Sequence, residues 1–362
     1  MTQPIIRVLI VDDSAFVRKV VKEMLSRSPF IEVVGGAHDG AEALELAARL
    51  LPDVVTLDLM MPDMDGVEFL RRQMAVRPLP VVVCSIAHES GELALAAMDA
   101  GAVEFVQKPT ALASTRVYDV ADELIAKVKA AAQVEMVRVV PGPPPPAANG
   151  GSAAHASSGT SPAPRVAASP AAERADVVVI GVSTGGPQAL RYLIPRLPAD
   201  FPVPIAVVLH MPVGYTELYA RRLNELATLE VVEARDGDLL RAGTVFFAAA
   251  GRHLSLVRQE DGSVRCHLDL RPLDTLHRPA VDVLFRSAAD TFGARVLGVV
   301  MTGMGDDGLR GAAHIKARGG RVLTEEESSC IVYGMPRAVA EAALSDRSAT
   351  LAQLADVIAG MI

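Results

Sequence analysis

The sequence has few cysteines, no long apolar run and no signal-like start, and each absence excludes a class of protein. Only three cysteines occur in 362 residues, Cys84, Cys266 and Cys330, and none is spaced for a disulfide framework or a metal site. We interpret them as small hydrophobic residues in a reducing compartment. The apolar stretches are strand-sized, and residues 1–7 lack a signal peptide's apolar region. We therefore expect a cytoplasmic protein that does not insert into a membrane.

The sequence also lacks any block of like charge. Its formal net charge is −8 and its pI is about 5.5. A nucleic-acid-binding surface requires a basic stripe or patch, which is missing here. The chain also has no compact basic helix-turn-helix tail, so a DNA-binding regulator is the weakest of the functional alternatives.

Length and composition predict two domains joined by a linker. A chain of 362 residues, half of them hydrophobic, exceeds the usual size of a single core. From residue 141 the composition changes to proline, alanine, glycine and serine without an aromatic residue. Such a segment cannot bury enough apolar surface to offset the entropy of ordering it, so we predict disorder. The predicted boundaries are a first domain at 1–130, a linker at 131–174 and a second domain at 175–362.

Both predicted domains alternate short apolar runs with helical patterns. This alternation is typical of doubly wound α/β folds, in which a mostly parallel sheet carries helices on both faces. The apolar runs predict strands at Ile5–Val11, Val54–Leu57, Val81–Cys84 and 102–106, and then at Val177–Ile180, Ile205–Leu209, Thr244–Phe247 and Val296–Met301.

Five polar residues follow the predicted strands of the first domain: Asp12, Asp13, Asp58, Ser85 and Lys108. In open α/β sheets the carboxyl ends of the strands form the ligand-binding edge. Three carboxylates with a nearby hydroxyl and ammonium group suit Mg²⁺ and a phosphoryl group. Each acid alone is as well explained as a loop residue or helix N-cap, but five matching strand ends favour a phosphoryl site.

These residues, with Leu57-Asp58-Leu59-Met60-Met61-Pro62 and Lys108-Pro109, resemble a two-component receiver domain over roughly residues 5–128. The resemblance implies a flavodoxin-like fold in which Asp58 accepts the phosphoryl group. It also implies that Asp12 and Asp13, together with Asp58, hold Mg²⁺.

The same resemblance assigns three further residues of the first domain. It implies that Ser85 and Lys108 contact the phosphoryl oxygens. Phe105 occupies the switch-aromatic position, and because phenylalanine has no hydroxyl group, a hydroxyl-mediated signal is excluded.

A serine flanked by glycines follows the first predicted strand of the second domain, in Gly181-Val182-Ser183-Thr184-Gly185-Gly186. A strand-to-helix turn of this kind exposes a hydroxyl group for nucleophilic attack. A serine needs a base, and His210 ends the next predicted strand. The segment 302–308, which follows a later strand, offers Asp306 and Asp307 to orient the imidazole and glycines for an oxyanion site.

Each of these elements also has a structural explanation when it is taken alone. The glycines around Ser183 suit a phosphate-binding turn at a helix N-terminus, and a single histidine at a strand end is commonly structural. The chain order serine, histidine, aspartate also differs from the order in α/β-hydrolases. The sequence leaves open a non-catalytic output domain in which Ser183 lines a nucleotide or anion site.

The combination of motifs resembles a chemotaxis methylesterase catalytic domain of the CheB type over about residues 175–362. The motifs are the Ser183 segment, Leu209-His210-Met211-Pro212, His277-Arg278-Pro279, residues 302–308 and Tyr333-Gly334-Met335-Pro336. The resemblance implies a Rossmann-like serine hydrolase without a cofactor at the esterase site. It makes Ser183 the nucleophile, His210 the base and Asp307 the orienting acid.

The resemblance also places the Met304 amide in the oxyanion hole with Thr184 nearby, and for His277 we favour a structural role. It implies hydrolysis of glutamyl methyl esters, and deamidation of glutamines, on the cytoplasmic domains of methyl-accepting chemoreceptors. The implied phosphodonor is a CheA-type histidine kinase, and phosphorylation is expected to relieve inhibition by the first domain.

Overall fold

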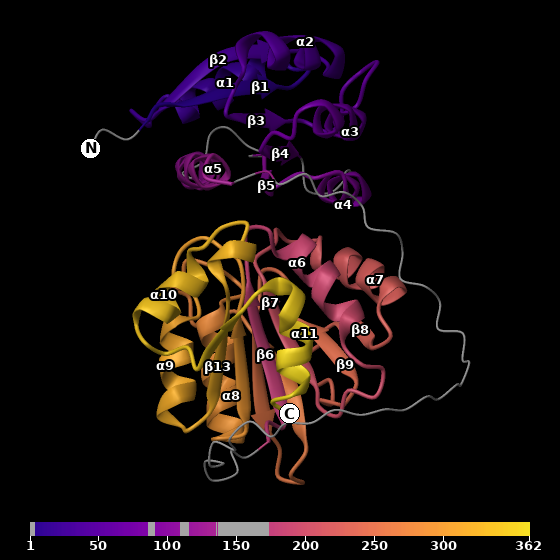
Figure 1. Ribbon diagram of the computed structural model, residues 1–362, viewed down its shortest axis with the longest axis vertical. Coiled ribbons are helices and arrows are strands. Elements are labelled where there is room, and N and C mark those ends of the chain that lie inside the picture. The colour runs from indigo at the N-terminus through magenta and orange to yellow at the C-terminus, as the bar shows by residue number, and fades with distance from the viewer. Residues whose placement is uncertain (1–3, 86–90, 109–115, 135, 137–173) are drawn as a thin grey trace, which may run out of the picture.

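The structure is a computed structural model that describes residues 4–85, 91–108, 116–134, 136 and 174–362. The predicted linker falls largely on residues 137–173, which lie outside the described residues. Two domains are stacked along the long axis of the molecule (Figure 1). No helix in the described part of the chain is long and apolar enough to cross a membrane.

The first domain is built on a five-stranded parallel sheet in the order β2-β1-β3-β4-β5. Its strands are β1 (Ile6–Val11), β2 (Ile31–Ala37), β3 (Val54–Leu57), β4 (Val81–Ser85) and β5 (Glu104–Gln107). Sequence reasoning did not predict β2, because its two glycines interrupt the apolar pattern. This sheet order brings the carboxyl ends of β1, β3, β4 and β5 to one edge.

In the described part of the chain, five helices cover this sheet. They are α1 (Ala15–Leu25), α2 (Gly40–Leu50), α3 (Gly66–Val76), α4 (Gly91–Asp99) and α5 (Arg116–Ala131). One core contains side chains of α1 and α5, and the other contains side chains of α2, α3 and α4, so the helices lie on both faces. Side-chain oxygens of Ser14, Asp39 and Asp65 cap the N-termini of α1, α2 and α3.

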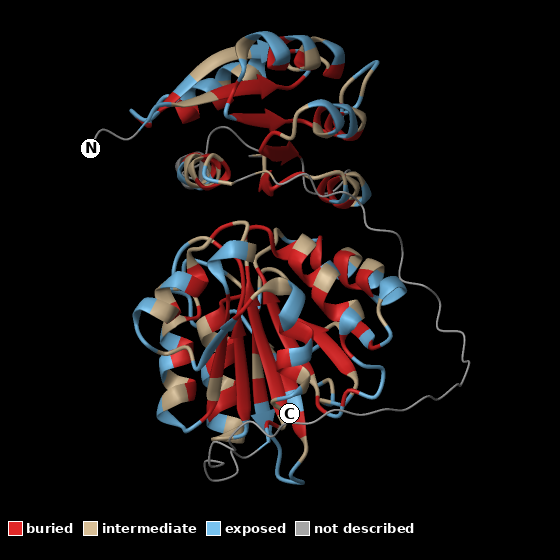
Figure 2. Cartoon of the chain, viewed as in Figure 1, coloured by how far each residue is buried: buried red, intermediate tan, exposed pale blue. Residues whose placement is uncertain are grey.

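The second domain is built on a seven-stranded parallel sheet in the order β14-β13-β12-β6-β7-β9-β8. Its strands are β6 (Val177–Val182), β7 (Ile205–Leu209), β8 (Glu230–Glu233), β9 (Thr244–Phe247), β12 (Val296–Val300), β13 (Arg321–Glu325) and β14 (Arg347–Ala349). Every residue of β6, β7, β9 and β12 is buried (Figure 2), as expected of parallel strands covered on both faces.

Helices also cover both faces of the second sheet. One face packs against α6 (Gly186–Leu193), α7 (Thr216–Leu226) and α11 (Leu351–Ala359). The other packs against α8 (Val281–Phe292), α9 (Leu309–Ala317), α10 (Met335–Glu341) and the antiparallel hairpin β10 (His253–Arg258) and β11 (Val264–Asp269). Two short 3₁₀ helices, Ile194–Arg196 and Glu327–Ser329, complete the domain.

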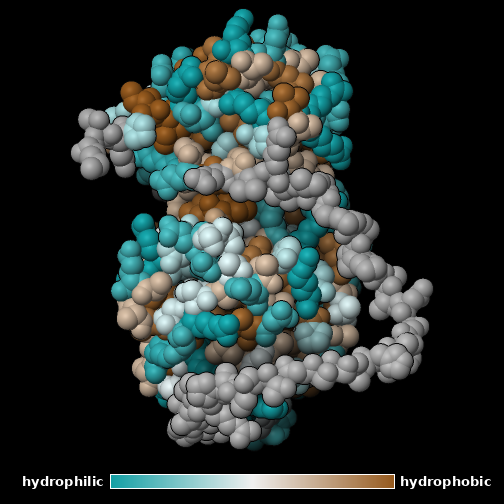
Figure 3. Space-filling view, in the orientation of Figure 1, coloured by the Kyte–Doolittle hydropathy of each residue, from teal (hydrophilic) through white to brown (hydrophobic). Residues whose placement is uncertain are grey.

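The expected fold class, two doubly wound parallel α/β domains, is confirmed by this topology and by a solved structure described below. The two domains also contact each other directly. Leu95 of α4 lies in a core of the second domain, and the Phe105 ring lies 4.8 Å from the Tyr215 ring, between centroids. Apolar side chains gather where the domains meet (Figure 3). The first domain therefore packs on the second through its α4–β5 face.

Candidate functional site

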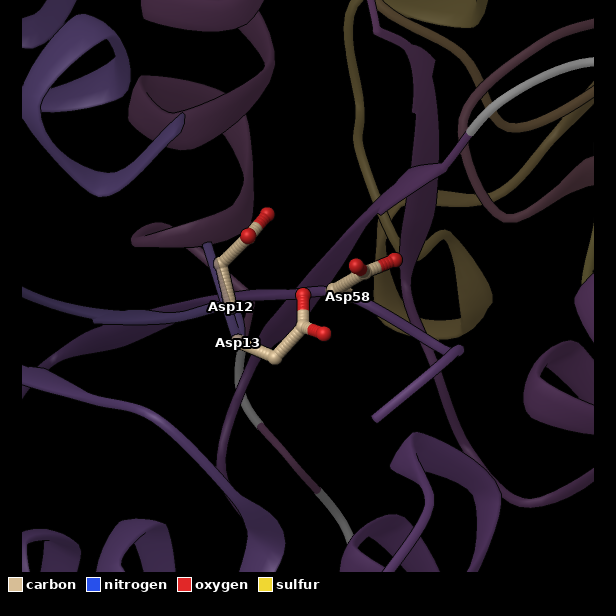
Figure 4. A group of neighbouring side chains, drawn as sticks. All are labelled: Asp12, Asp13 and Asp58. Carbon is tan, nitrogen blue, oxygen red and sulfur yellow. The ribbon is translucent and has the colours of Figure 1, made fainter. Parts of the chain in front are cut away.

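The structure brings the predicted carboxylates of the first domain together. Asp12 and Asp13 directly follow β1, and Asp58 directly follows β3. One carboxylate oxygen from each of the three lies within 4.8 Å of the others (Figure 4). Because β1 and β3 are adjacent parallel strands, the sheet itself holds this cluster together.

Lys108 links two of these carboxylates. Its ammonium nitrogen lies 2.6 Å from Asp12 Oδ2 and 2.7 Å from Asp58 Oδ2. Burial raises the pKa of Asp12, although the bond and charge of Lys108 offset part of the rise. Asp58 Oδ1 also accepts a hydrogen bond from the Leu59 amide at 2.8 Å, so its side chain has a fixed orientation.

The donor set fits a divalent cation. Mg²⁺ prefers hard oxygen ligands from a few carboxylates together with water, and Asp13 is exposed to the solvent that would supply the water ligands. Ser85, the last residue of β4, is buried at the same edge, and its carbonyl oxygen accepts a hydrogen bond from the Lys108 amide. All five predicted residues thus belong to one sheet edge.

In the second domain, Ser183 lies in a tight turn between β6 and α6. Its amide donates to the Thr302 carbonyl at 3.0 Å, and its own carbonyl accepts from the Gly186 amide at 2.7 Å. Gly185 has a φ of +79°, which favours glycine at this position. A Cβ added to Gly303 would lie 2.8 Å from Ser183 Cβ, so the two segments touch only because residue 303 is glycine.

His210 and Asp307 form a hydrogen-bonded pair at the same sheet edge. His210 follows β7, which pairs in parallel with β6 so that Leu209 lies beside Val182. Ser183 and His210 therefore end two adjacent strands. His210 Nε2 lies 2.9 Å from Asp307 Oδ2, and both side chains are about nine-tenths buried. The neighbouring Asp306 is exposed, so the structure selects Asp307 as the partner of the imidazole.

Asp307 also caps the N-terminus of α8. It accepts hydrogen bonds from the amides of Val281 at 2.8 Å and Asp282 at 2.9 Å. Desolvation alone would raise the pKa of Asp307, but the bond from His210 and these amides lower it overall. Asp282 in turn accepts from the amides of Gly308 and Gly311 at the start of α9. This reciprocal arrangement keeps Asp307 ionised and oriented.

The other ring nitrogen of His210 is available for chemistry. Its Nδ1 is buried and has no hydrogen-bond partner among the described residues. Because Nε2 donates to the ionised Asp307, Nδ1 of a neutral imidazole carries a lone pair. That lone pair can accept a proton from a nearby hydroxyl, and Ser183 ends the adjacent strand.

Sequence reasoning favoured a structural role for His277, but the structure places it against the site. Its ring stacks on the His210 ring, with centroids 4.1 Å apart and planes 23° apart. Desolvation and the nearby His210 lower the pKa of His277 to about 4, so at neutral pH the stacked ring is uncharged. In the sequence, the only indication that His277 belongs to the site was its place directly before Arg278-Pro279 in one of the family motifs.

The segment 302–308 packs directly against the Ser183 turn. Thr302 donates to the Thr184 carbonyl at 2.9 Å, and its amide donates to the buried Glu325 at 2.9 Å. Burial raises the pKa of Glu325. The amide of Met304, in contrast, donates to no acceptor among the described residues, as a free oxyanion donor must. The roles of Thr184 and Met304 in an oxyanion hole stay predictions.

Comparisons with known proteins agree with this geometry. A family model described as CheB methylesterase matches residues 178–358, and one described as response regulator receiver domain matches residues 8–117. The solved CheB methylesterase catalytic domain of Thermotoga maritima is similar at 39% identity and a TM-score of 0.51, over 52% of this chain and 99% of that chain.

Two full-length relatives are also similar. A protein-glutamate methylesterase/protein-glutamine glutaminase from Myxococcus xanthus is 53% identical over 349 residues, which span 96% of this chain and 95% of that protein. One of the same name from Symbiobacterium thermophilum is 44% identical over 98% of this chain and 96% of its own length. The chain therefore belongs to the CheB methylesterase family, with a response regulator receiver domain preceding its catalytic domain.

Proposed function

We propose that this protein hydrolyses glutamyl methyl esters on methyl-accepting chemoreceptors, releases methanol and restores glutamate. The observation that carries the proposal is the His210–Asp307 pair. His210 and Ser183 end adjacent strands, and Nδ1 of the imidazole has no hydrogen-bond partner among the described residues. Relatives spanning almost the whole chain bear the name protein-glutamate methylesterase, which supports the same reaction.

The proposed chemistry has two steps. The Ser183 oxygen attacks the ester carbonyl while His210 Nδ1 takes the hydroxyl proton, and the ionised Asp307 stabilises the imidazolium. The C–O bond to the methoxide breaks as His210 returns the proton, so methanol leaves and a glutamyl-enzyme remains. Water, deprotonated by His210, then attacks the acyl carbon and releases glutamate and the serine.

The amide of Met304 is the proposed oxyanion donor, with Thr184 in a supporting position. A free backbone amide aimed at a developing negative charge strengthens catalysis, because it needs no reorganisation during the reaction. The same tetrahedral geometry forms when an amide is attacked, so we also propose that the enzyme deamidates receptor glutamines. The names of the relatives, which include protein-glutamine glutaminase, support this second activity.

Regulation is assigned to the first domain. Asp58 is the proposed phosphoryl acceptor, Ser85 and Lys108 contact its phosphoryl oxygens, and Asp12, Asp13 and Asp58 hold Mg²⁺. The bound cation supplies positive charge that offsets the phosphoryl group. A CheA-type histidine kinase is the proposed phosphodonor. Because its substrates are cytoplasmic receptor domains, we place the enzyme in the cytoplasm.

The interdomain contacts support inhibition by the unphosphorylated receiver. Phe105, the proposed switch residue, is buried against Tyr215 of the catalytic domain. Gln188 of α6 donates to the Ala102 carbonyl at 2.6 Å. Phosphorylation at Asp58 is proposed to shift Phe105 and loosen this contact.

The test is methanol release from a methylated receptor fragment, measured with and without a small phosphodonor. We expect slow release that rises with phosphodonor, because allosteric couplings of about 1–3 kcal/mol correspond to factors of roughly 5–150. Ser183→Ala is expected to lose several powers of ten in rate, as other serine hydrolases do without their nucleophile. Substantial release by Ser183→Ala would contradict the catalytic assignment and favour a non-catalytic binding output.

A further inference from the structure

The catalytic domain carries an exposed apolar rim beside its active site. We define the docking rim as Val213, Leu270, Leu273 and Leu276, which expose 59%, 52%, 68% and 94% of their surfaces. Exposed large apolar side chains that cluster on a soluble protein mark interaction sites. We propose that the docking rim binds the receptor polypeptide through apolar side chains next to the modified glutamate; this inference rests on the proposed function.

The rim is a structured part of the fold, because a buried histidine holds its loop. His253 Nε2 lies 3.1 Å from the Pro272 carbonyl and 3.2 Å from Thr275 Oγ1. Its Nδ1 accepts from the Ala280 amide at 3.2 Å. The imidazole therefore fixes the segment between β11 and α8 at three points, and the leucines are presented on a defined scaffold.

Both segments of the rim adjoin the catalytic groups. Leu276 directly precedes His277, whose ring stacks on His210. Val213 follows His210 by three residues, and a Cβ added to Gly251 would lie 3.0 Å from Val213 Cγ2. The Gly251 amide in turn donates to the Arg278 carbonyl at 2.9 Å, so the Val213 and leucine segments are neighbours. A polypeptide that reaches Ser183 past the stacked histidines meets this rim.

The described part of the receiver leaves the rim exposed. In the same structure the His210 side chain is only 9% exposed, whereas Leu276 is 94% exposed. The rim therefore stays open while the receiver packs against the adjoining α6–α7 surface. The two surfaces are therefore separate: the rim binds the receptor polypeptide, whereas the receiver contacts α6 and α7. The occupant is a polypeptide, since a methyl ester alone is too small to bury four separate apolar side chains.

The experiment compares the full-length double variant Leu273→Ser/Leu276→Ser with the matched variant Val257→Ser. Val257 is also exposed and apolar, but it lies in β10, away from the rim. Methanol release is measured against the concentration of methylated receptor fragment, with phosphodonor present. We expect the double variant to raise KM at least about tenfold, equal to about 1.4 kcal/mol, with kcat little changed and Val257→Ser like the wild type.

A second readout separates binding from folding and from the proposed function itself. The rate at which a small fluorophosphonate labels Ser183 depends on the catalytic groups and not on receptor binding. We expect equal labelling rates in the wild type and the double variant. An unchanged KM, an equal rise in Val257→Ser, or slower labelling of the double variant would each overturn the docking assignment. A wild-type enzyme that neither labels nor releases methanol would instead contradict the proposed function.

Discussion

Removal of the Asp99 carboxylate tests the inhibitory contact between the domains. Asp99 ends α4 of the receiver and pairs with two arginines of the catalytic domain, Arg191 of α6 and Arg222 of α7, the latter at 3.4 Å. The Asp99 side chain is 39% exposed, so each pair contributes only about 0.2–1 kcal/mol. Loss of both pairs weakens docking by about 0.4–2 kcal/mol, a factor of about 2–30.

We therefore expect Asp99→Ala to raise basal methanol release by about 2- to 30-fold without phosphodonor. The matched control is Glu45→Ala, which removes an exposed helical carboxylate from α2, on the far side of the receiver, and leaves basal release unchanged. Because exposed pairs are screened, the difference between Asp99→Ala and the wild type shrinks as salt approaches 1 M, where the Debye length is about 3 Å. Unchanged or lower basal activity in Asp99→Ala would refute inhibition through this surface.

Three further predictions concern the catalytic pair and the stacked histidine. Asp307→Asn is expected to lower kcat by about 10⁴-fold, as in serine proteases with the same change. It should also destabilise the fold by about 1–3 kcal/mol, because the Val281 amide loses its acceptor. A loss of less than tenfold in the rate of methanol release would contradict the role assigned to Asp307. His277→Ala is expected to lower kcat by up to about 10²-fold through misplacement of His210. His277→Phe should keep most of the wild-type kcat, because the stacked ring is uncharged at neutral pH. Equal losses of kcat in both variants would refute stacking on His210 as the role of His277. The pKa of His277 is lowered from 6.5 to about 4 in the folded chain, so between pH 4 and 6.5 the unfolded chain binds more protons and the free energy of unfolding falls as the pH drops. In thermal unfolding across this pH range, the stability of His277→Phe should fall less steeply than that of the wild type. An equal pH dependence in both proteins would contradict the lowered pKa of His277.

Much of the fold was predictable because parallel strands are buried on both faces. The Val177–Ile180 and Ile205–Leu209 runs predicted β6 and β7 almost to the residue. Strands without a continuous apolar run were missed. Among them are β2, which contains two glycines, and the β10–β11 hairpin, which lies outside the main sheet and includes exposed residues in both strands. Strand order could not be predicted, since it depends on crossovers that no local pattern encodes.

The candidate site was predictable where a functional residue follows an obvious strand. Ser183, His210 and Asp58 all do so, and chain position alone placed them at a ligand-binding edge. The residues alone left Asp306 and Asp307 as alternatives, and only the family resemblance selected Asp307, because the choice depends on its bonds to α8 and His210. His277 stacks on His210, which lies 67 positions earlier in the chain. His277 belongs to an irregular loop whose path no local sequence pattern predicts, so only the folded structure could show the stack.

Covalent labelling of Ser183 shows whether its hydroxyl group is the activated nucleophile. The full-length protein is treated with a fluorophosphonate in the presence of phosphodonor, and the modified residue is identified by peptide mass spectrometry. We expect one modified serine, at position 183, and labelling that slows by orders of magnitude in His210→Ala. Labelling at another serine, or at Ser183 with equal speed in His210→Ala, would contradict the claim that this hydroxyl is activated by the imidazole.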